Sequence, residues 1–197
     1  MSPRTKKQFD EIREESREKI LQTAMRVFAR DGYSGSTVRV IVKEAGISQG
    51  LLYNYFAGKE DLLKAVYLRG MKDVGASFAE AETGAGQPPE KLAVFIRSSF
   101  RHVRENREFW QLSYNLRMQR AVLSLLADEV EDSTAVILKQ LEKLLRKTGN
   151  KKPRIEAAML FALIDGVSQH YVLNPDDYPL EEVTNRIIER YCRASET

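Results

Sequence analysis

Residues 37–59, TVRVIVKEAGISQGLLYNYFAGK, constrain the fold of this chain more than any other segment. Apolar side chains recur at helical spacing in the first half, which predicts a short helix with one buried face: Val38, Ile41, Val42 and Ala45. Gly46 is expected to end this helix, because glycine adopts the left-handed conformation of a C-cap at little cost. Ser48 stands where the N-cap of a second helix belongs. Two short helices around a tight turn form a helix-turn-helix, whose second helix can enter the major groove of DNA.

The segment GISQGLLYNYFAGKEDLL, preceded by Thr37 and by the pair at 32–33, resembles the DNA-binding domain of TetR/AcrR-family transcriptional regulators. The resemblance covers about the first third of the chain and rests on many positions at fixed spacing. Four residues differ from those commonest in the family: Val42, Leu51, Tyr55 and Gly58. The resemblance implies an all-α fold, with an N-terminal three-helix helix-turn-helix domain followed by a helical domain for ligand binding and dimerisation.

The periodicity of the whole chain fits this fold class. No alternating strand pattern occurs, and helical patterns predict about nine helices. We expect a polar N-terminal arm at 1–15, a DNA-binding domain at 16–60 and an effector-binding and dimerisation domain at 61–197. The arm, which contains Arg4, is either a frayed tail or a segment that reaches a DNA groove. Two flanking helices are expected to bury these residues: Ile20, Ala24, Val27 and Phe28 in the first, and Leu62, Leu63, Val66 and Leu68 in the second.

Charge is distributed unevenly along the chain. Residues 1–72 contain 14 Lys/Arg and 9 Asp/Glu, whereas the remainder contains 17 and 19. The basic excess therefore accompanies the helix-turn-helix, as binding to a polyanion favours. The excess is small, so it indicates nucleic-acid binding only weakly on its own.

Cysteine usage and hydropathy indicate the compartment. Cys192 is the single cysteine, which excludes an intramolecular disulfide and is typical of a reducing environment. The N-terminal region has no apolar core of the kind found in signal peptides. The longest apolar run, at 157–164, is far shorter than the ~18 residues of a membrane span. We expect a cytoplasmic protein with no membrane association.

Phosphate contacts are predicted at the helix starts, where free backbone N–H groups and a hydroxyl can bind an anion. Thr37 and Ser48 occupy these positions, although N-capping without DNA explains them equally well. Gly50 would let the backbone approach a phosphate closely. The remaining candidates carry hydroxyl or ammonium groups: Tyr53, Tyr55 and Lys59. Core packing is the alternative for Tyr53.

Base contacts are predicted for Arg39 and Gln49. Arginine binds guanine O6 and N7 in a bidentate manner, and glutamine binds adenine similarly. The family resemblance also implies that these two positions touch bases, whereas a solvated helix face is the alternative. Leu51, against a thymine methyl group, and Asn54, against an adenine edge or a phosphate, are weaker candidates.

One helix-turn-helix contacts only a few base pairs, so a homodimer on a near-palindromic operator is expected, with recognition helices ~34–36 Å apart. Whether one dimer or two bind each operator is not encoded. The resemblance implies a dimer interface formed by the helices at 154–173 and 180–192. Their apolar faces could alternatively belong to the internal core.

The resemblance also implies an effector pocket in the larger domain. Its mixture of residues favours a small apolar or aromatic ligand, although aromatic and Met side chains at helical spacing usually belong to the core. The candidate lining residues are Phe95, Phe100, His102, Trp110, Tyr114, Met118, Met159, Phe161 and His170.

No catalytic or metal-binding pattern is present. The two histidines lack the spacing of a zinc motif, no Ser lies in G-x-S-x-G, and a single cysteine argues against a structural zinc site. We therefore expect neither an enzyme nor a bound cofactor.

The resulting hypothesis is a ligand-responsive dimeric repressor that its effector releases from the operator. The alternative is a helical small-molecule carrier or enzyme with a purely structural helix-turn-helix, which steep salt dependence of DNA binding would exclude. Whether the protein represses or activates transcription depends on where the operator lies relative to the promoter.

Overall fold

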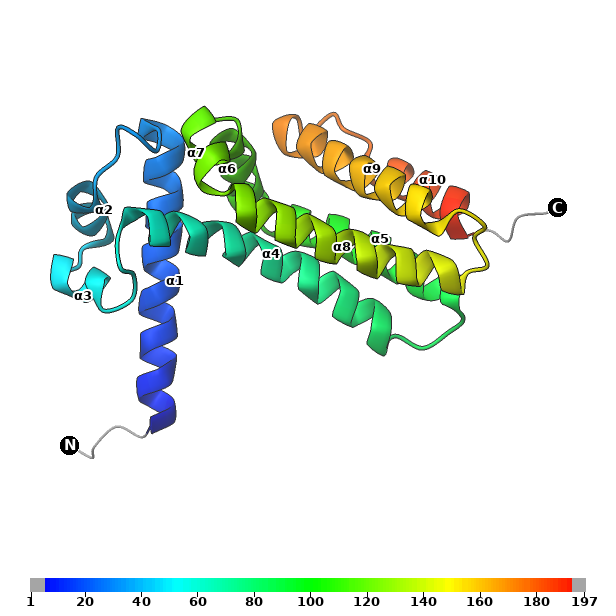
Figure 1. Ribbon diagram of the computed structural model, residues 1–197, viewed down its shortest axis with the longest axis horizontal. Helices are drawn as coiled ribbons and strands as arrows, with labels where there is room; N and C mark the ends of the chain where they lie inside the picture. The colour runs from blue at the N-terminus through cyan, green and yellow to red at the C-terminus, as the bar shows by residue number, and fades with distance from the viewer. Residues whose placement is uncertain (1–5, 193–197) are drawn as a thin grey trace. The chain divides into compact units, whose positions relative to one another are not determined.

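The computed structural model describes residues 6–192, and every regular element in this range is an α-helix (Figure 1). The ten helices are α1 (Lys6–Asp31), α2 (Val38–Ala45), α3 (Gln49–Tyr53), α4 (Lys59–Thr83), α5 (Pro88–Glu105), α6 (Arg107–Arg117), α7 (Arg120–Leu125), α8 (Ala127–Lys147), α9 (Pro153–Leu173) and α10 (Leu180–Cys192). The all-α prediction is confirmed. The count exceeds the predicted nine because short α7 lies between two breaks that no glycine or proline marks.

Helix α1 begins far earlier than the pattern of apolar residues indicated. Residues 6–15 are helical, so the interpretation of this segment as a frayed tail is wrong from Lys6 onward. The segment has almost no apolar face, but oppositely charged side chains three or four residues apart favour a helix. Such pairs join Lys7 to Glu11 and Glu14 to Arg17. Arg4 lies outside the described residues.

The chain divides into two compact units. The first extends to Arg69 and includes residues 112–126, and the second comprises residues 70–111 and those from Ala127 onward. The core of the first unit contains the predicted faces of α1 and α4, fully or almost fully buried: Ile20, Ala24, Val27, Phe28, Leu62, Leu63 and Val66. The prediction for Leu68 is wrong, since its side chain is 50% exposed.

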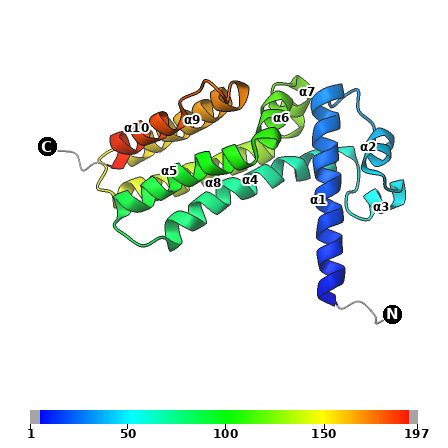
Figure 2. The same cartoon turned by 180° about the vertical axis from the view of Figure 1, so that it is seen from behind.

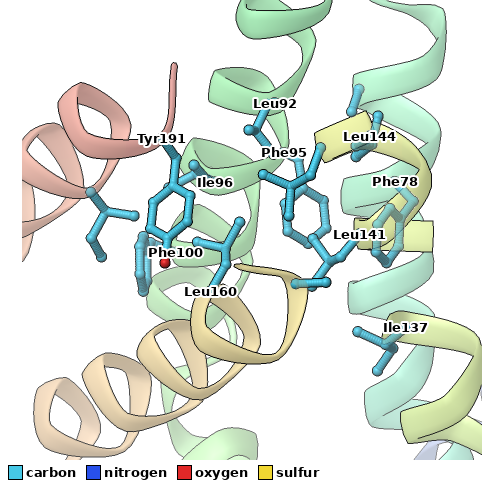
Figure 3. Close-up of a cluster of buried hydrophobic side chains, with 14 of the residues drawn as sticks. Phe78, Leu92, Phe95, Ile96, Phe100, Ile137, Leu141, Leu144, Leu160 and Tyr191 are labelled. Atoms are coloured by element: carbon cyan, nitrogen blue, oxygen red, sulfur yellow. The ribbon is translucent and has the colours of Figure 1, made fainter. Parts of the chain in front are cut away.

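The second unit is a helical bundle in which α5 packs against α8, α9 and α10, as the view from behind shows (Figure 2). Its core combines side chains from these helices with Phe78 of α4 (Figure 3). The rings of Phe78 and Phe95 stack with their centroids 4.3 Å apart. Burial of such aromatic and aliphatic surface is the main driving force for this packing.

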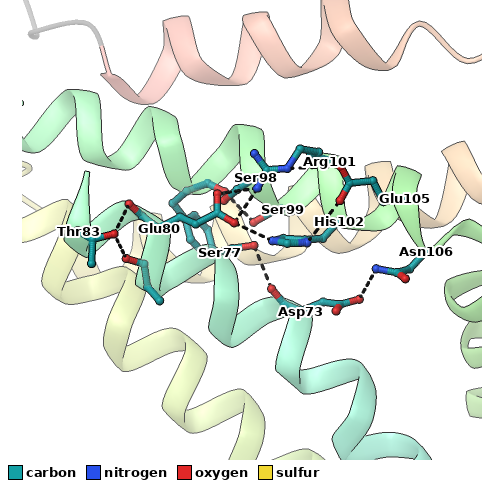
Figure 4. A network of polar contacts seen from close by, with 12 residues as sticks. Asp73, Ser77, Glu80, Thr83, Ser98, Ser99, Arg101, His102, Glu105 and Asn106 are labelled. Carbon is teal, nitrogen blue, oxygen red and sulfur yellow. Dashed lines mark hydrogen bonds and ion pairs between the residues drawn. The ribbon is translucent and has the colours of Figure 1, made fainter. Parts of the chain in front are cut away.

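A polar network joins α4 to α5 within the second unit (Figure 4). The Arg101 guanidinium donates to both carboxylate oxygens of Glu80 at 2.6 Å, and His102 Nε2 lies 3.0 Å from Glu80 Oε1. At the C-cap of α5, the side-chain amide of Asn106 donates to Asp73 Oδ2 at 3.2 Å. These contacts and the stacked phenylalanines fix α4 on its α5 side.

Membrane insertion has no support in the described part of the chain, where no helix is both long and apolar enough to cross a bilayer.

Candidate functional site

The two helices of the helix-turn-helix begin with the predicted caps. The Thr37 hydroxyl oxygen accepts from the Val40 N–H at 3.3 Å, and that of Ser48 accepts from the Leu51 N–H at 3.1 Å. Gly46 ends α2 with φ 65°, the left-handed conformation expected of it. The hydroxyl protons of both caps remain able to donate to a phosphate, so capping and DNA contact are compatible.

The polar side of this motif faces solvent. The side chains of Arg39, Gln49 and Asn54 are exposed, whereas Leu52 and Phe56 lie buried beneath them. Tyr53 is 49% exposed, so it is not a core residue. These are the conditions that base contacts in a groove require, because the apolar face holds the helices while the polar face stays free.

The other predicted contact residues in and after α3 differ in exposure. Leu51 and Tyr55 are half-buried. Gly50 is exposed, and a Cβ atom placed there would meet nothing within 4 Å, so its backbone is open to close approach. The Gln49 amide lies 3.5 Å from the Tyr53 hydroxyl.

Lys59 has a structural role that the sequence did not indicate. Its ammonium donates to the carbonyl oxygens of Tyr33 and Ser36, at 2.9 and 3.0 Å, and lies 4.3 Å from the centroid of the Tyr33 ring. Two of its three donors therefore hold the loop before α2 against the start of α4. Its contact with a phosphate remains a prediction.

Arg13 is a candidate DNA contact that sequence analysis missed. Its guanidinium lies 5.8 Å from the centroid of Tyr55, and that of Arg17 lies 5.6 Å from Phe56. α1 thus brings positive charge to the end of the recognition helix α3. The helical spacing of the two arginines is visible in the sequence, but their aromatic partners follow only from the fold.

Gln119, between α6 and α7, is the second residue that sequence analysis missed. Its Nε2 donates to the Phe28 carbonyl oxygen at 3.2 Å, and its Oε1 accepts from the Tyr33 N–H at 2.8 Å. Its side chain therefore pairs with two backbone groups where α1 ends, the Phe28 carbonyl oxygen and the Tyr33 N–H, within the first unit. No local pattern signals this contact, since Gln119 lies 86 residues from Tyr33 in the chain.

The structure does not bring the nine predicted effector contacts together. Phe95, Phe100 and Trp110 are buried in the second unit, Phe161 packs against its core, and His102 belongs to the polar network. The remaining four are dispersed. Tyr114 and Met118 belong to the first unit, the former buried and the latter 78% exposed, and Met159 and His170 are exposed on α9.

Two of the hollows in the second unit lie between its helices and have the size of ligand sites or parts of them. One of about 530 Å³ lies between α5 and the α9–α10 connection and is lined by arginine, glutamate and aromatic side chains, including Phe100. The other, of about 240 Å³, lies between α4 and α8 and is mainly apolar. Small-molecule sites typically measure ~300–1,000 Å³.

An exposed helix-turn-helix joined to a helical unit with such hollows defines a DNA-binding transcriptional regulator. Two family models agree with this assignment. The model of bacterial regulatory proteins of the tetR family matches residues 20–66, and that of the C-terminal domain of BetI-type transcriptional repressors matches residues 88–195, more than half of the chain. The chain belongs to the TetR family, and it is a ligand-responsive regulator of transcription, not an enzyme.

The similar proteins include regulators named for fatty acid metabolism and degradation. The fatty acid metabolism regulator protein of Bacillus subtilis (strain 168) is 26% identical over 176 residues, which cover 86% of this chain and 90% of the relative. Two solved structures share the fold. FadR from Bacillus subtilis in complex with stearoyl-CoA has a TM-score of 0.70 at 23% identity, covering 90% of this chain and 98% of that one. The fatty acid degradation regulator FadR from Bacillus halodurans has a TM-score of 0.72 at 23% identity, covering 89% and 94%.

Proposed function

We propose that this protein is a dimeric repressor that binds a near-palindromic operator and is released by a fatty acyl effector. The exposed polar face of the helix-turn-helix, with Arg39 and Gln49 held over a buried apolar face, carries the DNA-binding part of the proposal. We accordingly expect the protein in the cytoplasm, where it would meet its operator.

The relatives support the effector class. One of them is named for the regulation of fatty acid metabolism, and a structure with the same fold contains stearoyl-CoA. Both similarities extend over most of this chain, including the second unit. We therefore narrow the expected apolar effector to an acyl derivative with a long alkyl chain.

The apolar surface of α9 supports the dimer. Ile155, Met159 and Leu163 follow one another at four-residue spacing and are 57%, 41% and 38% exposed. The opposite face of α9 is also apolar and buried, and a helix that is hydrophobic on all sides normally has partners on all sides. The exposed positions of α10 are mostly charged or polar, so we assign this helix to the edge of the proposed interface.

Selection of duplexes from a random DNA pool tests the DNA-binding function. We expect enrichment of an inverted repeat, with affinity that falls steeply as salt rises because phosphate contacts release counterions. Gln49→Ala should relax the preference at one base pair in each half-site by about 1–3 kcal/mol. Arg146→Ala removes an exposed charge of the second unit and should change neither sequence preference nor the salt slope. Weak binding with a flat salt response would favour a carrier with a structural helix-turn-helix.

Sedimentation tests the dimer. Leu163→Asp places a charge on the α9 surface and should convert the dimer to a monomer. Leu123→Asp, at a residue 53% exposed in the first unit, is the matched control and should leave the mass unchanged. A Leu163→Asp protein that sediments as the wild type would contradict the proposed interface.

A further inference from the structure

The hollow of about 530 Å³ between α5 and the α9–α10 connection, called the polar hollow below, has an aromatic floor. The side chains of Phe100 and Tyr171, which line it, are 2% and 9% exposed, and that of Tyr178 is half-buried. Pro175 and Pro179 of the connection add further apolar surface. A floor of this kind suits the apolar or aromatic body of a ligand.

The α5 wall of the polar hollow is positively charged. Arg97, Arg101 and Arg104 recur at spacings of four and three residues, so they share one face of the helix. Arg101 donates to both carboxylate oxygens of Glu80, which compensates its charge (Figure 4). Arg97 donates to the neutral Asn185 Oδ1 at 3.0 Å and keeps its charge. Within residues 6–192, the exposed guanidinium of Arg104 has neither a hydrogen bond nor an ion pair.

The α10 wall is negatively charged. Glu181 and Glu182 stand in the first turn of α10, and both are exposed. In the described part of the chain, no ion pair joins either of them to Arg97 or Arg104. The helix dipole favours acidic residues in this turn, but it does not account for the two arginines that line the same hollow. Charges of opposite sign thus line one hollow without neutralising each other.

This charge pattern discriminates among ligands. A ligand with a single negative charge is attracted by the arginines and repelled by the two carboxylates, and the reverse holds for a cation. A zwitterion pairs with both walls at once, through charge-assisted hydrogen bonds that are stronger than neutral ones. The two uncompensated arginines and the two glutamates balance, so the lining favours a ligand that carries no net charge.

We propose that the polar hollow binds a zwitterion of the amino-acid class. The carboxylate of the ligand pairs with Arg104, its ammonium pairs with Glu181 and Glu182, and its apolar side chain covers Phe100 and Tyr178. The volume of about 530 Å³ admits an amino acid with a large side chain or a dipeptide. The polar hollow shares no lining residue with the hollow between α4 and α8, so this binding does not depend on the acyl effector proposed above.

Calorimetric titration of the full-length protein at pH 7 tests the ligand class. The two zwitterionic probes are L-phenylalanine and L-phenylalanyl-L-alanine, which differ in the separation of their charges. The two controls are 3-phenylpropanoate and phenethylamine, which keep the aromatic body of phenylalanine but carry one charge each. We expect the better zwitterion to bind at least about tenfold more tightly than either control, because each control leaves the charges of one wall without a partner.

Variants in each wall test the location. Arg104→Gln should weaken binding of the zwitterion and of 3-phenylpropanoate by about tenfold to a hundredfold, the range for loss of a hydrogen bond to a charged group, and should not weaken binding of phenethylamine. The double variant Glu181→Gln, Glu182→Gln should show the opposite selectivity between the two controls. Arg107→Gln and Glu108→Gln, at exposed residues of α6 outside the lining, should match the wild type. Thermal unfolding without ligand verifies that each variant is folded.

Every other result overturns the proposal at a definite point. If neither zwitterion binds the wild-type protein, the polar hollow is not an amino-acid site. If a zwitterion binds but both wall variants retain wild-type affinity, the ligand occupies another place. Equal affinity of L-phenylalanine and 3-phenylpropanoate would refute the role given to Glu181 and Glu182, and equal affinity of L-phenylalanine and phenethylamine would refute that of Arg104.

Discussion

Replacement of Gln119 by alanine should destabilise the first unit measurably although the side chain is only half-buried. The change removes the donor to the Phe28 carbonyl and the acceptor of the Tyr33 N–H. A neutral hydrogen bond contributes about 0.5–1.5 kcal/mol, so the loss of both amounts to about 1–3 kcal/mol. Residual access of water to the two backbone groups favours the lower half of that range.

Urea denaturation at one protein concentration measures this effect, because association shifts the apparent stability of a dimer. Gln119→Glu keeps an oxygen for the Tyr33 N–H but loses the donor to the Phe28 carbonyl oxygen. Its free energy of unfolding should therefore also be lower than that of the wild type. Met118→Ala, at a side chain 78% exposed, should change the free energy of unfolding by less than about 0.5 kcal/mol. If Gln119→Ala were as stable as Met118→Ala, the role assigned to this contact would be refuted.

Three further predictions concern other contacts. Lys59→Met should lower the free energy of unfolding by about 1–3 kcal/mol in urea, because two loop carbonyls lose a charged donor while the apolar stem remains. Hydrogen bonds from Arg101 and His102 hold the pKa of the Glu80 carboxyl in the folded protein below its usual 4.5. The ionised carboxylate therefore stabilises the folded state above the usual pKa, and this stabilisation is lost as the pH falls through the lower pKa of the folded state. The stability difference between the wild type and Glu80→Gln should therefore shrink in acid titrations, and a constant difference would contradict this assignment. Burial raises the pKa of Cys192 to about 11, so iodoacetamide at pH 8 should alkylate it more slowly in the folded protein than in urea, and equal rates would refute its burial.

Local signals were sufficient for the helix-turn-helix. The caps at Thr37 and Ser48, the stop at Gly46 and the buried face of α2 all depend on interactions within a few residues. Such interactions can be recognised from residue type and spacing alone. For the same reason the exposed positions of Arg39 and Gln49 could be predicted before the fold was known.

The effector candidates show the limit of periodicity. Spacing marked Phe95, Met118 and Met159 as apolar members of helices, but it does not say which unit or which neighbour each one faces. The fold places Phe95 in the core, Met118 on the surface of the first unit and Met159 on the exposed stripe of α9. The apolar hollow between α4 and α8 is instead lined by residues that the sequence did not single out.

The sequence by itself determined the helix-turn-helix, the all-α class and most of the buried face of each N-terminal helix, because short-range hydrogen bonds and periodic burial decide those features. Only the tertiary structure decided that Gln119 closes the end of α1, that Lys59 binds loop carbonyls, and that Gly75 borders a hollow. These contacts join residues far apart in the chain or depend on the gap between two helices. Residue type restricts such pairings without selecting among them, and the packing of the helices makes the selection.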